Sequence, residues 1–123
     1  MPQQVIIVGD SSLIYSIFRN LVDNVIAYAT DASLVEITCK PIVHDKRQLY
    51  EFSVSDNGLG VEPQHLEHIF ERFYRVDKGR SRKLGGTGLG LAIVKNAVTV
   101  LGGTVTAIPT PGGGLTVMFT LQG

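Results

Sequence analysis

The sequence predicts a single α+β domain, and three observations lead to that prediction. The chain has 123 residues, of which 44% are apolar and 18% charged, the balance of one folded domain with its own core. Two stretches repeat apolar residues at helical spacing. Two pairs of stretches alternate apolar and polar residues, and a short turn joins the members of each pair. Helices together with hairpins place the chain in the α+β class.

The first half of the chain is predicted to hold a short strand, a long helix and a hairpin. A strand-like run at residues 4–8 ends at Gly9, and residues 10–12 offer N-caps for a helix. Strands near residues 35–39 and 50–54 flank a polar turn at residues 44–48, and the alternation buries Cys39 as an inert thiol. The helix itself is predicted from one buried stripe of apolar residues: Leu13, Ile14, Ile17, Phe18, Leu21, Val22 and Val25.

The second half is predicted to hold a short helix, a loop, a second long helix and a closing hairpin. "DNGLGV" marks a tight turn, and residues 62–70 read as a short helix with Pro63 near its first position. Residues 73–86 lack periodicity and carry many charges, so we expect a mobile loop. The second helix is predicted at residues 89–101, before two glycines that stop it, and the hairpin turns at "TPGGG".

Bulk properties exclude several classes of protein. The net charge is zero, so no overall field favours nucleic acid or a membrane surface as a partner. A single cysteine excludes an internal disulfide and a multi-cysteine metal site. We expect a cytoplasmic location, because no apolar run is long enough to cross a bilayer and "MPQQVIIVGD" lacks the features of an export signal. Positive charge is concentrated locally, with six basic residues between Glu71 and Lys83.

Two amides stand on one edge of the first predicted helix. Asn20, Asn24 and Tyr28 are spaced four residues apart, so they share a helical edge beside strongly apolar faces. Amides are poor helix formers in mid-helix, which suggests that they serve another purpose. An amide oxygen is a hard, neutral ligand that suits Mg²⁺. The alternative interpretation is a pair of solvated helix amides.

The stretch "SDNGLGV" places a carboxylate at the end of a predicted strand. Gly58 and Gly60 allow the backbone to approach a flat ligand closely. Asp56 is then able to accept a hydrogen bond from an exocyclic amino group, which favours adenine over guanine, because guanine presents an acceptor at the equivalent atom. A plain turn is the alternative interpretation of this pattern.

The stretch "GGTGLGLAIVK" at residues 85–95 predicts an anion site. Gly86, Gly88 and Gly90 free backbone N–H groups, and the helix that begins near Leu89 adds the positive end of its dipole. The dinucleotide fingerprint is excluded, because the spacing is wrong and no strand precedes it. The Walker motif is excluded for want of its Gly-Lys-Ser/Thr ending, and a protein-kinase loop for want of the residues that accompany it.

The order of these motifs resembles the catalytic ATP-binding domain of sensor histidine kinases, in the ATPase superfamily shared with gyrase and MutL. Helix amides are followed by "DNGLG", then "IFERFYR", then "GGTGLGLAIVK", and the resemblance runs from about Val5 to Leu121. It implies the Bergerat ATP-binding fold, a two-layer sandwich with a mixed sheet covered by helices on one face and a flexible ATP lid. Residues 1–123 would be one catalytic domain without the dimerisation and phosphoacceptor-histidine domain.

The resemblance also implies a role for individual residues around Mg²⁺ and ATP. Asn24 would bind Mg²⁺ with Asn20 beside it, and both would serve catalysis. Tyr28 and Thr116 would lie near the adenine, and Asp56 would bind its amino group. Gly58 and Gly60 would shape the pocket floor, and Phe70 and Phe73 would anchor the lid by packing. Arg75, Arg80 and Lys83 would reach the phosphates. The lid hinge and its phosphate contact would be formed by Gly86, Thr87, Gly88, Leu89 and Gly90.

The same resemblance favours a kinase over a hydrolase. Superfamily hydrolases carry a general-base glutamate where this chain has Asn20, and an amide cannot take a proton at neutral pH. Transfer to a histidine of a separate dimerisation domain is therefore expected. None of His44, His65 and His68 carries an acceptor signal, and the latter two read as solvated helix residues, so the isolated chain is expected to bind Mg·ATP without phosphorylating itself.

The partners and the alternatives follow from the same comparison of motifs. The parent protein is expected to be a homodimer that acts on a response regulator indirectly and is cytoplasmic or anchored in the inner membrane, whereas this chain alone is expected to be monomeric. Ala27 stands where many family members carry a basic residue, so a catalytically degenerate nucleotide binder is one alternative. An anti-sigma-type serine kinase is another, although it gives no reason for "IFERFYR".

Overall fold

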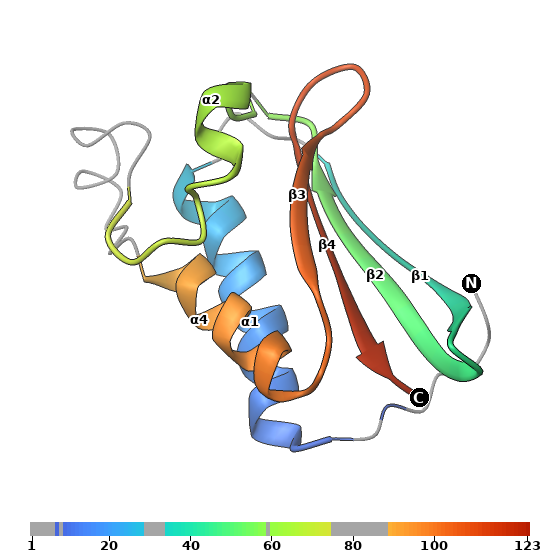
Figure 1. The fold of residues 1–123 in the computed structure, drawn as a ribbon. Helices are drawn as coiled ribbons and strands as arrows, with labels where there is room; N and C mark the ends of the chain where they lie inside the picture. Colours follow the sequence, from blue (N-terminus) through green and yellow to red (C-terminus); the bar gives the residue numbers. More distant parts are fainter. Residues whose placement is uncertain (1–6, 8, 29–33, 59, 75–88) are drawn as a thin grey trace.

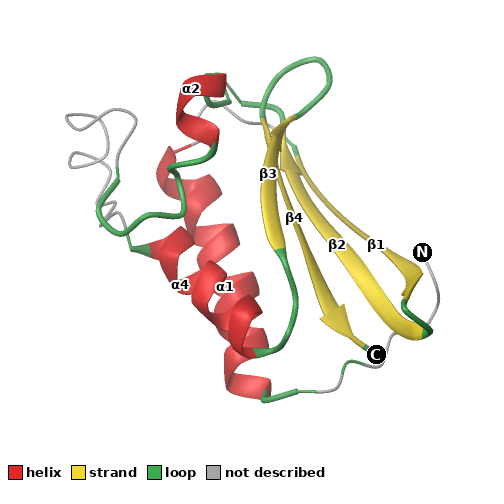
Figure 2. Ribbon diagram, viewed as in Figure 1, coloured by secondary structure: helices red, strands yellow, loops and turns green. Residues whose placement is uncertain are grey.

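A computed structural model of the chain describes residue 7 and residues 9–28, 34–58, 60–74 and 89–123. Helices lie on one side of a sheet, in two layers (Figures 1 and 2). The predicted two-layer α+β architecture is therefore confirmed. The elements in chain order are α1 (Ser11–Tyr28), β1 (Val35–His44), β2 (Arg47–Asp56), α2 (Pro63–Leu66), α4 (Gly90–Val100), β3 (Val105–Pro109) and β4 (Leu115–Gln122).

The described strands form one sheet in the order β1-β2-β4-β3. Every pair in it is antiparallel, so within the described residues the sheet is antiparallel rather than mixed. The reason is connectivity: β1 with β2 and β3 with β4 are two hairpins, and their inner strands β2 and β4 also run in opposite directions. The strand expected at residues 4–8 lies outside the described residues, except for Ile7.

The β1–β2 turn is tighter than the sequence suggested. His44 pairs directly with Arg47, which leaves only Asp45 and Lys46 in the turn. Both turn residues have positive φ, at 50° and 65°. This is the conformation of the two-residue hairpin turn whose twist matches that of the strands, and aspartate is one of the residues that tolerate it.

Helix α1 begins at the cap that the sequence indicated. The Asp10 Oδ1 atom accepts hydrogen bonds from the Ser12 N–H at 2.8 Å and from the Ser12 hydroxyl at 2.6 Å. Ile17 and Leu21 are buried, with 0% and 2% of their surface exposed. Val22 differs from the prediction, because it is 40% exposed and lies on the flank of the helix rather than in its buried stripe.

Helix α4 lies against α1 and ends in a glycine cap. Its buried residues are Leu91, Val94, Ala97 and Val98. The Gly102 N–H donates to the Thr99 carbonyl at 3.0 Å, and the Gly103 N–H donates to the Val98 carbonyl at 2.9 Å. With a φ of 83° at Gly102, these bonds form the Schellman motif, so the predicted glycine stop is confirmed.

The core lies between the helices and the two inner strands. The Phe18 ring of α1 packs edge-on against Phe52 of β2 and Phe119 of β4, with ring centroids 5.5 Å apart in both cases. Phe52 and Phe119 stack with their centroids 5.2 Å apart. This three-ring contact fixes α1 above the centre of the sheet.

The edge strand β1 is covered less than its alternation predicted. Cys39 is buried as expected, at 6% exposure, and burial raises the pKa of its thiol, which fits an inert core cysteine. Val35 and Ile37, on the same side of the strand, remain 43% and 47% exposed. The difference arises because α1 sits over β2 and β4 and leaves the edge uncovered. In the part of the chain described here, no helix is long and apolar enough to cross a membrane.

Candidate functional site

Asp56 forms a buried corner at the end of β2. Only 6% of its surface is exposed, and it lies on the helix-facing side of the strand with Phe52 and Val54. Its Oδ1 atom accepts hydrogen bonds from the Gly58 N–H at 2.9 Å and from the Leu115 N–H at 3.4 Å. Backbone donors from two different segments therefore hold the carboxylate in one orientation.

The chain approaches this corner so closely that only glycine fits. A Cβ added to Gly114 would lie 1.9 Å from the carbonyl oxygen of Asp56 and 3.0 Å from its Oδ1 atom. A Cβ added to Gly60 would lie 2.8 Å from the carbonyl oxygen of Gly114. Gly60 and Gly114 thus approach each other closely within the chain, whereas the approach to a flat ligand predicted for Gly60 stays a prediction. The sequence signal for Gly114 is the run "TPGGG", which by itself indicates only a turn.

Thr116 points away from this corner, which contradicts its predicted place beside the adenine. It pairs with Ser55 in the sheet, and its hydroxyl bonds to the hydroxyls of Ser55 at 2.9 Å and Thr110 at 2.8 Å. Side chains alternate along a strand, so Thr116 lies on the face opposite Asp56. Leu115, one residue earlier, lies on the Asp56 side instead and is 7% exposed.

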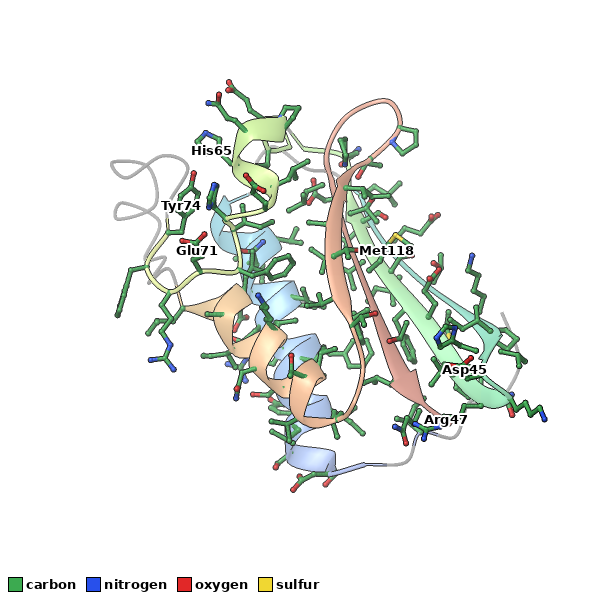
Figure 3. The ribbon with its side chains drawn as sticks, in the orientation of Figure 1. Asp45, Arg47, His65, Glu71, Tyr74 and Met118 are labelled. Carbon is green, nitrogen blue, oxygen red and sulfur yellow. The ribbon has the colours of Figure 1, made fainter. Side chains whose placement is uncertain are left out.

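A shallow cavity of about 280 Å³ lies on that opposite face of the sheet. Figure 3 shows Met118, one of its lining residues, pointing away from the helices. Its lining residues are Thr38, Cys39, Lys40, Glu51, Ser53, Thr116 and Met118. This cavity is separated from Asp56 by the sheet, so it is not part of the candidate site.

Asn20 lies where α1 meets α4. Its Nδ2 group donates to the Ser16 carbonyl at 2.8 Å, which fixes the orientation of the amide. Its Oδ1 atom faces the start of α4, since a Cβ added to Gly90 would lie 3.6 Å from it. Two residues predicted for the site, far apart in the sequence, are thus brought together. Asn24 is half-buried one turn further along α1, and the side chain of Tyr28 lies outside the described residues.

The two phenylalanines of "IFERFYR" behave differently. Phe70 is half-buried and packs against the core, and its role as a lid anchor stays a prediction. Phe73 is 66% exposed, so the packing predicted for it is not found. Its backbone has a positive φ of 64°, a conformation that is uncommon for a residue other than glycine. Leu89 is the N-cap residue of α4.

The remaining residues predicted to contact phosphate lie outside the described residues. They are Arg75, Arg80, Lys83, Gly86, Thr87 and Gly88.

Two histidines form a cluster that sequence reasoning missed. His65 and His68 were expected to be solvated, but both contact Tyr74. The hydrogen bond of His68 to Glu71, at 2.5 Å, raises the pKa of His68. Among the described residues, no group of three or more His, Cys, Asp or Glu side chains is arranged to hold a metal ion.

The structure thus presents a buried aspartate at a glycine corner and, where α1 meets α4, an amide held in one orientation. The family described as "Histidine kinase-, DNA gyrase B-, and HSP90-like ATPase" matches residues 9–123. The chain belongs to this family, which confirms the resemblance drawn from its motifs. The sensor histidine kinase WalK of Bacillus subtilis is 41% identical over 112 residues, which cover 91% of this chain and 18% of WalK.

Solved structures support the same assignment. The mycobacterial sensor histidine kinase MprB superimposes with a TM-score of 0.73 and 30% identity, covering 95% of this chain and 76% of that one. Full-length ShkA, crystallised in complex with AMPPNP, superimposes with a TM-score of 0.68 and 29% identity, covering 94% of this chain and 22% of ShkA. The chain therefore spans about a fifth of the length of a multidomain sensor kinase such as WalK.

Proposed function

We propose that this chain binds Mg·ATP and donates the γ-phosphoryl group to a histidine on a separate dimerisation domain, in two-component signal transduction. The observation that carries the proposal is the fixed, buried carboxylate of Asp56 at the corner shared by β2 and β4. The family and the relatives named sensor histidine kinases support it. The AMPPNP complex of ShkA supports an adenine nucleotide as the ligand.

The proposed adenine contact follows from the hydrogen bonds of Asp56. Its Oδ1 atom already accepts from two backbone N–H groups, so we assign the exocyclic amino group of adenine to the rest of the carboxylate. Guanine would present a carbonyl oxygen there, leaving two acceptors facing each other. Gly60 and Gly114 let the backbone pack closely around this corner, and Leu115 supplies an apolar wall on the Asp56 side.

The phosphate end of the nucleotide is assigned to the contact between α1 and α4. Asn24 would hold Mg²⁺, with the oriented amide oxygen of Asn20 beside it, since amide oxygens are suitable ligands for this ion. Bound Mg²⁺ would neutralise the charge of the triphosphate. The start of α4 lies close to Asn20, and the N–H groups of a helix N-terminus suit an anion. We also assign Arg75, Arg80 and Lys83 to the phosphates.

Asn20 directs the reaction toward transfer rather than hydrolysis. Its amide cannot remove a proton from water, and its Nδ2 group is already engaged with the Ser16 carbonyl. In the proposed transfer, the bond between the γ-phosphorus and the β,γ-bridging oxygen breaks, and ADP leaves with the electron pair. A bond forms from phosphorus to the unprotonated nitrogen of the acceptor imidazole, and the proton on the other ring nitrogen is released to solvent. The chain itself would position the phosphoryl group.

Titration calorimetry of Asp56→Asn tests the nucleotide site. Asparagine keeps an oxygen for the Gly58 and Leu115 N–H groups but places an amide donor toward the adenine amino group. A charge-assisted hydrogen bond contributes about 1.5–3 kcal/mol, so ATP should bind about 10- to 150-fold more weakly. Asp45→Asn, in the exposed turn at the opposite end of the hairpin, is the control (Figure 3). Unchanged affinity of Asp56→Asn for ATP, or equal affinity of the wild type for GTP, would refute the assignment.

Transfer is tested by adding a dimerisation-and-histidine domain of a relative such as WalK in trans. We expect acid-labile label from γ-labelled ATP on that domain and none on this chain. Label on His44, His65 or His68 would contradict the proposal. Nucleotide binding without any transfer would favour the degenerate binder that Ala27 suggests. Within the same proposal, the parent protein is a homodimeric sensor that passes the phosphoryl group to a response regulator, and this domain works in the cytoplasm.

A further inference from the structure

Tyr74 lies between two histidines of the preceding segment. The Nδ1 atom of His65 and the hydroxyl of Tyr74 share a hydrogen bond of 2.5 Å. The His68 ring stacks on the Tyr74 ring, with centroids 5.3 Å apart and planes inclined by 28°. Figure 3 shows His65, Glu71 and Tyr74 gathered beside α2. We call His65, His68 and Tyr74 the histidine clamp.

Both ring nitrogens of His68 face carboxylates. Its Nδ1 atom lies 2.5 Å from the Glu71 Oε2 atom, and its Nε2 atom lies 3.4 Å from the Glu67 Oε1 atom. A neutral imidazole carries one N–H and would turn a lone pair toward one of these carboxylates. Only the imidazolium offers a proton to each of them. The other titratable groups of the cluster are His65 and Tyr74.

The segment that carries the two histidines also packs against the core, so their contacts with Tyr74 connect Tyr74 to the core. Ile69, next to His68, is 8% exposed, and Phe70 packs against the core. Phe73, just before Tyr74, holds a positive φ of 64°, which a residue with a bulky side chain adopts only when its surroundings impose it. The contacts of Tyr74 with both histidines supply such a constraint. The backbone conformation at Phe73 and the position of the Tyr74 ring are thus tied to the two histidines.

We propose that protonated His68 and its partner His65 are positioning residues, which hold Tyr74 and thereby couple the affinity for Mg·ATP to pH. The inference rests on the proposed function, because Arg75, assigned to the phosphates, follows Tyr74 directly in the sequence. An imidazolium stacked on a tyrosine ring is held more strongly than a neutral imidazole, because the ring face is negative. The neutral form loses both this attraction and the ion pairs with Glu67 and Glu71.

The direction of the pH dependence follows from the charge of His68. The pKa of His68 is raised above its ordinary value of 6.5, first by the hydrogen bond to Glu71. The contribution of the clamp is therefore fully present below pH 6.5 and is lost as the pH rises through the raised pKa. The share of Mg·ATP affinity that depends on the clamp should decrease over the same range.

The test compares the dissociation constants for Mg·ATP of the wild type and His68→Phe across this pH range. Phenylalanine keeps a ring to stack on Tyr74 but removes the charge and the titration. ATP also titrates in this range, but identically for both proteins, so the ratio of the two constants isolates His68. An exposed cation–π contact changes affinity by about two- to fivefold. We therefore expect the dissociation constant of His68→Phe to exceed that of the wild type by this factor at low pH, and the two constants to be about equal at high pH. A ratio that does not change with pH would overturn the proposal.

A second measurement does not require nucleotide. In the free protein, the ring resonances of Tyr74 should follow the NMR titration of His68, and Glu71→Gln should lower the pKa of His68. His44→Gln, in the exposed β1–β2 turn, should change neither. A Tyr74 ring that does not respond to His68 would overturn the clamp. A responsive Tyr74 in a protein that binds no ATP would refute the proposed function but support the clamp itself.

Discussion

Replacing Gly114 by alanine should disrupt the Asp56 corner far more than the same change two residues earlier. Gly114 and Gly112 both have positive φ, at 111° and 87°, and both lie in the loop between β3 and β4. They differ in their surroundings. A Cβ on Gly114 would lie 1.9 Å from the Asp56 carbonyl oxygen, whereas a Cβ on Gly112 would meet nothing within 4 Å. The pair therefore separates steric conflict from backbone preference.

The expected magnitudes follow from these contacts. Gly112→Ala should cost about 1–2 kcal/mol, the penalty of an L-residue in a left-handed conformation. Gly114→Ala carries the same penalty, and its clash is with backbone, so no rotamer change relieves it. The start of β4 must move away from β2, which adds about 1–3 kcal/mol of overpacking and about 1 kcal/mol for the weakened Leu115–Asp56 hydrogen bond. The total is about 3–6 kcal/mol.

Urea denaturation of both variants measures the difference, since the midpoint shifts in proportion to the loss of stability. ATP affinity, measured where each protein is still folded, should fall for Gly114→Ala and remain close to wild type for Gly112→Ala. Free energies of unfolding that agree to within about 0.5 kcal/mol would refute the reasoning, because the close approach of Gly114 to Asp56 would then carry no energetic weight.

Two further predictions concern the core and the segment before Arg75. Phe119→Ala removes a ring that is 1% exposed and stacked on Phe52, so it should lower the free energy of unfolding by about 3–5 kcal/mol, as measured by urea denaturation. A loss below about 1 kcal/mol would show that the ring cluster is not packed as described. Phe73→Gly relieves the positive φ of an exposed residue, so it should raise the thermal midpoint slightly, whereas Phe73→Ala should not. Equal midpoints for these two variants would argue against strain at this position.

Local chemistry explains where sequence reasoning succeeded. The cap at Asp10, the glycine stop of α4 and the closing hairpin all depend on residues close together in the chain. The same holds for the order of the motifs, which was enough to assign the family. Periodicity also located Ile17 and Leu21 in the core, because a helix buries whichever stripe is apolar.

Face and register were not available from the sequence. Thr116 and Leu115 are adjacent, and one step along a strand changes which side of the sheet a side chain occupies, so the choice between them required the pairing of β2 with β4. The exposure of Val35 and Ile37 depended on where α1 crosses the sheet, which the pattern of β1 does not contain.

The sequence by itself determined the α+β class, the order of helices and hairpins, and the family, because these depend on patterns and motifs along the chain. Only the tertiary structure brought Gly114 against Asp56, placed Asn20 beside Gly90, and enclosed Tyr74 between two histidines. The physical reason is that these contacts join residues that are not neighbours in the chain. Their geometry is fixed by how helices and strands pack together, to within a few tenths of an ångström at close-packed contacts.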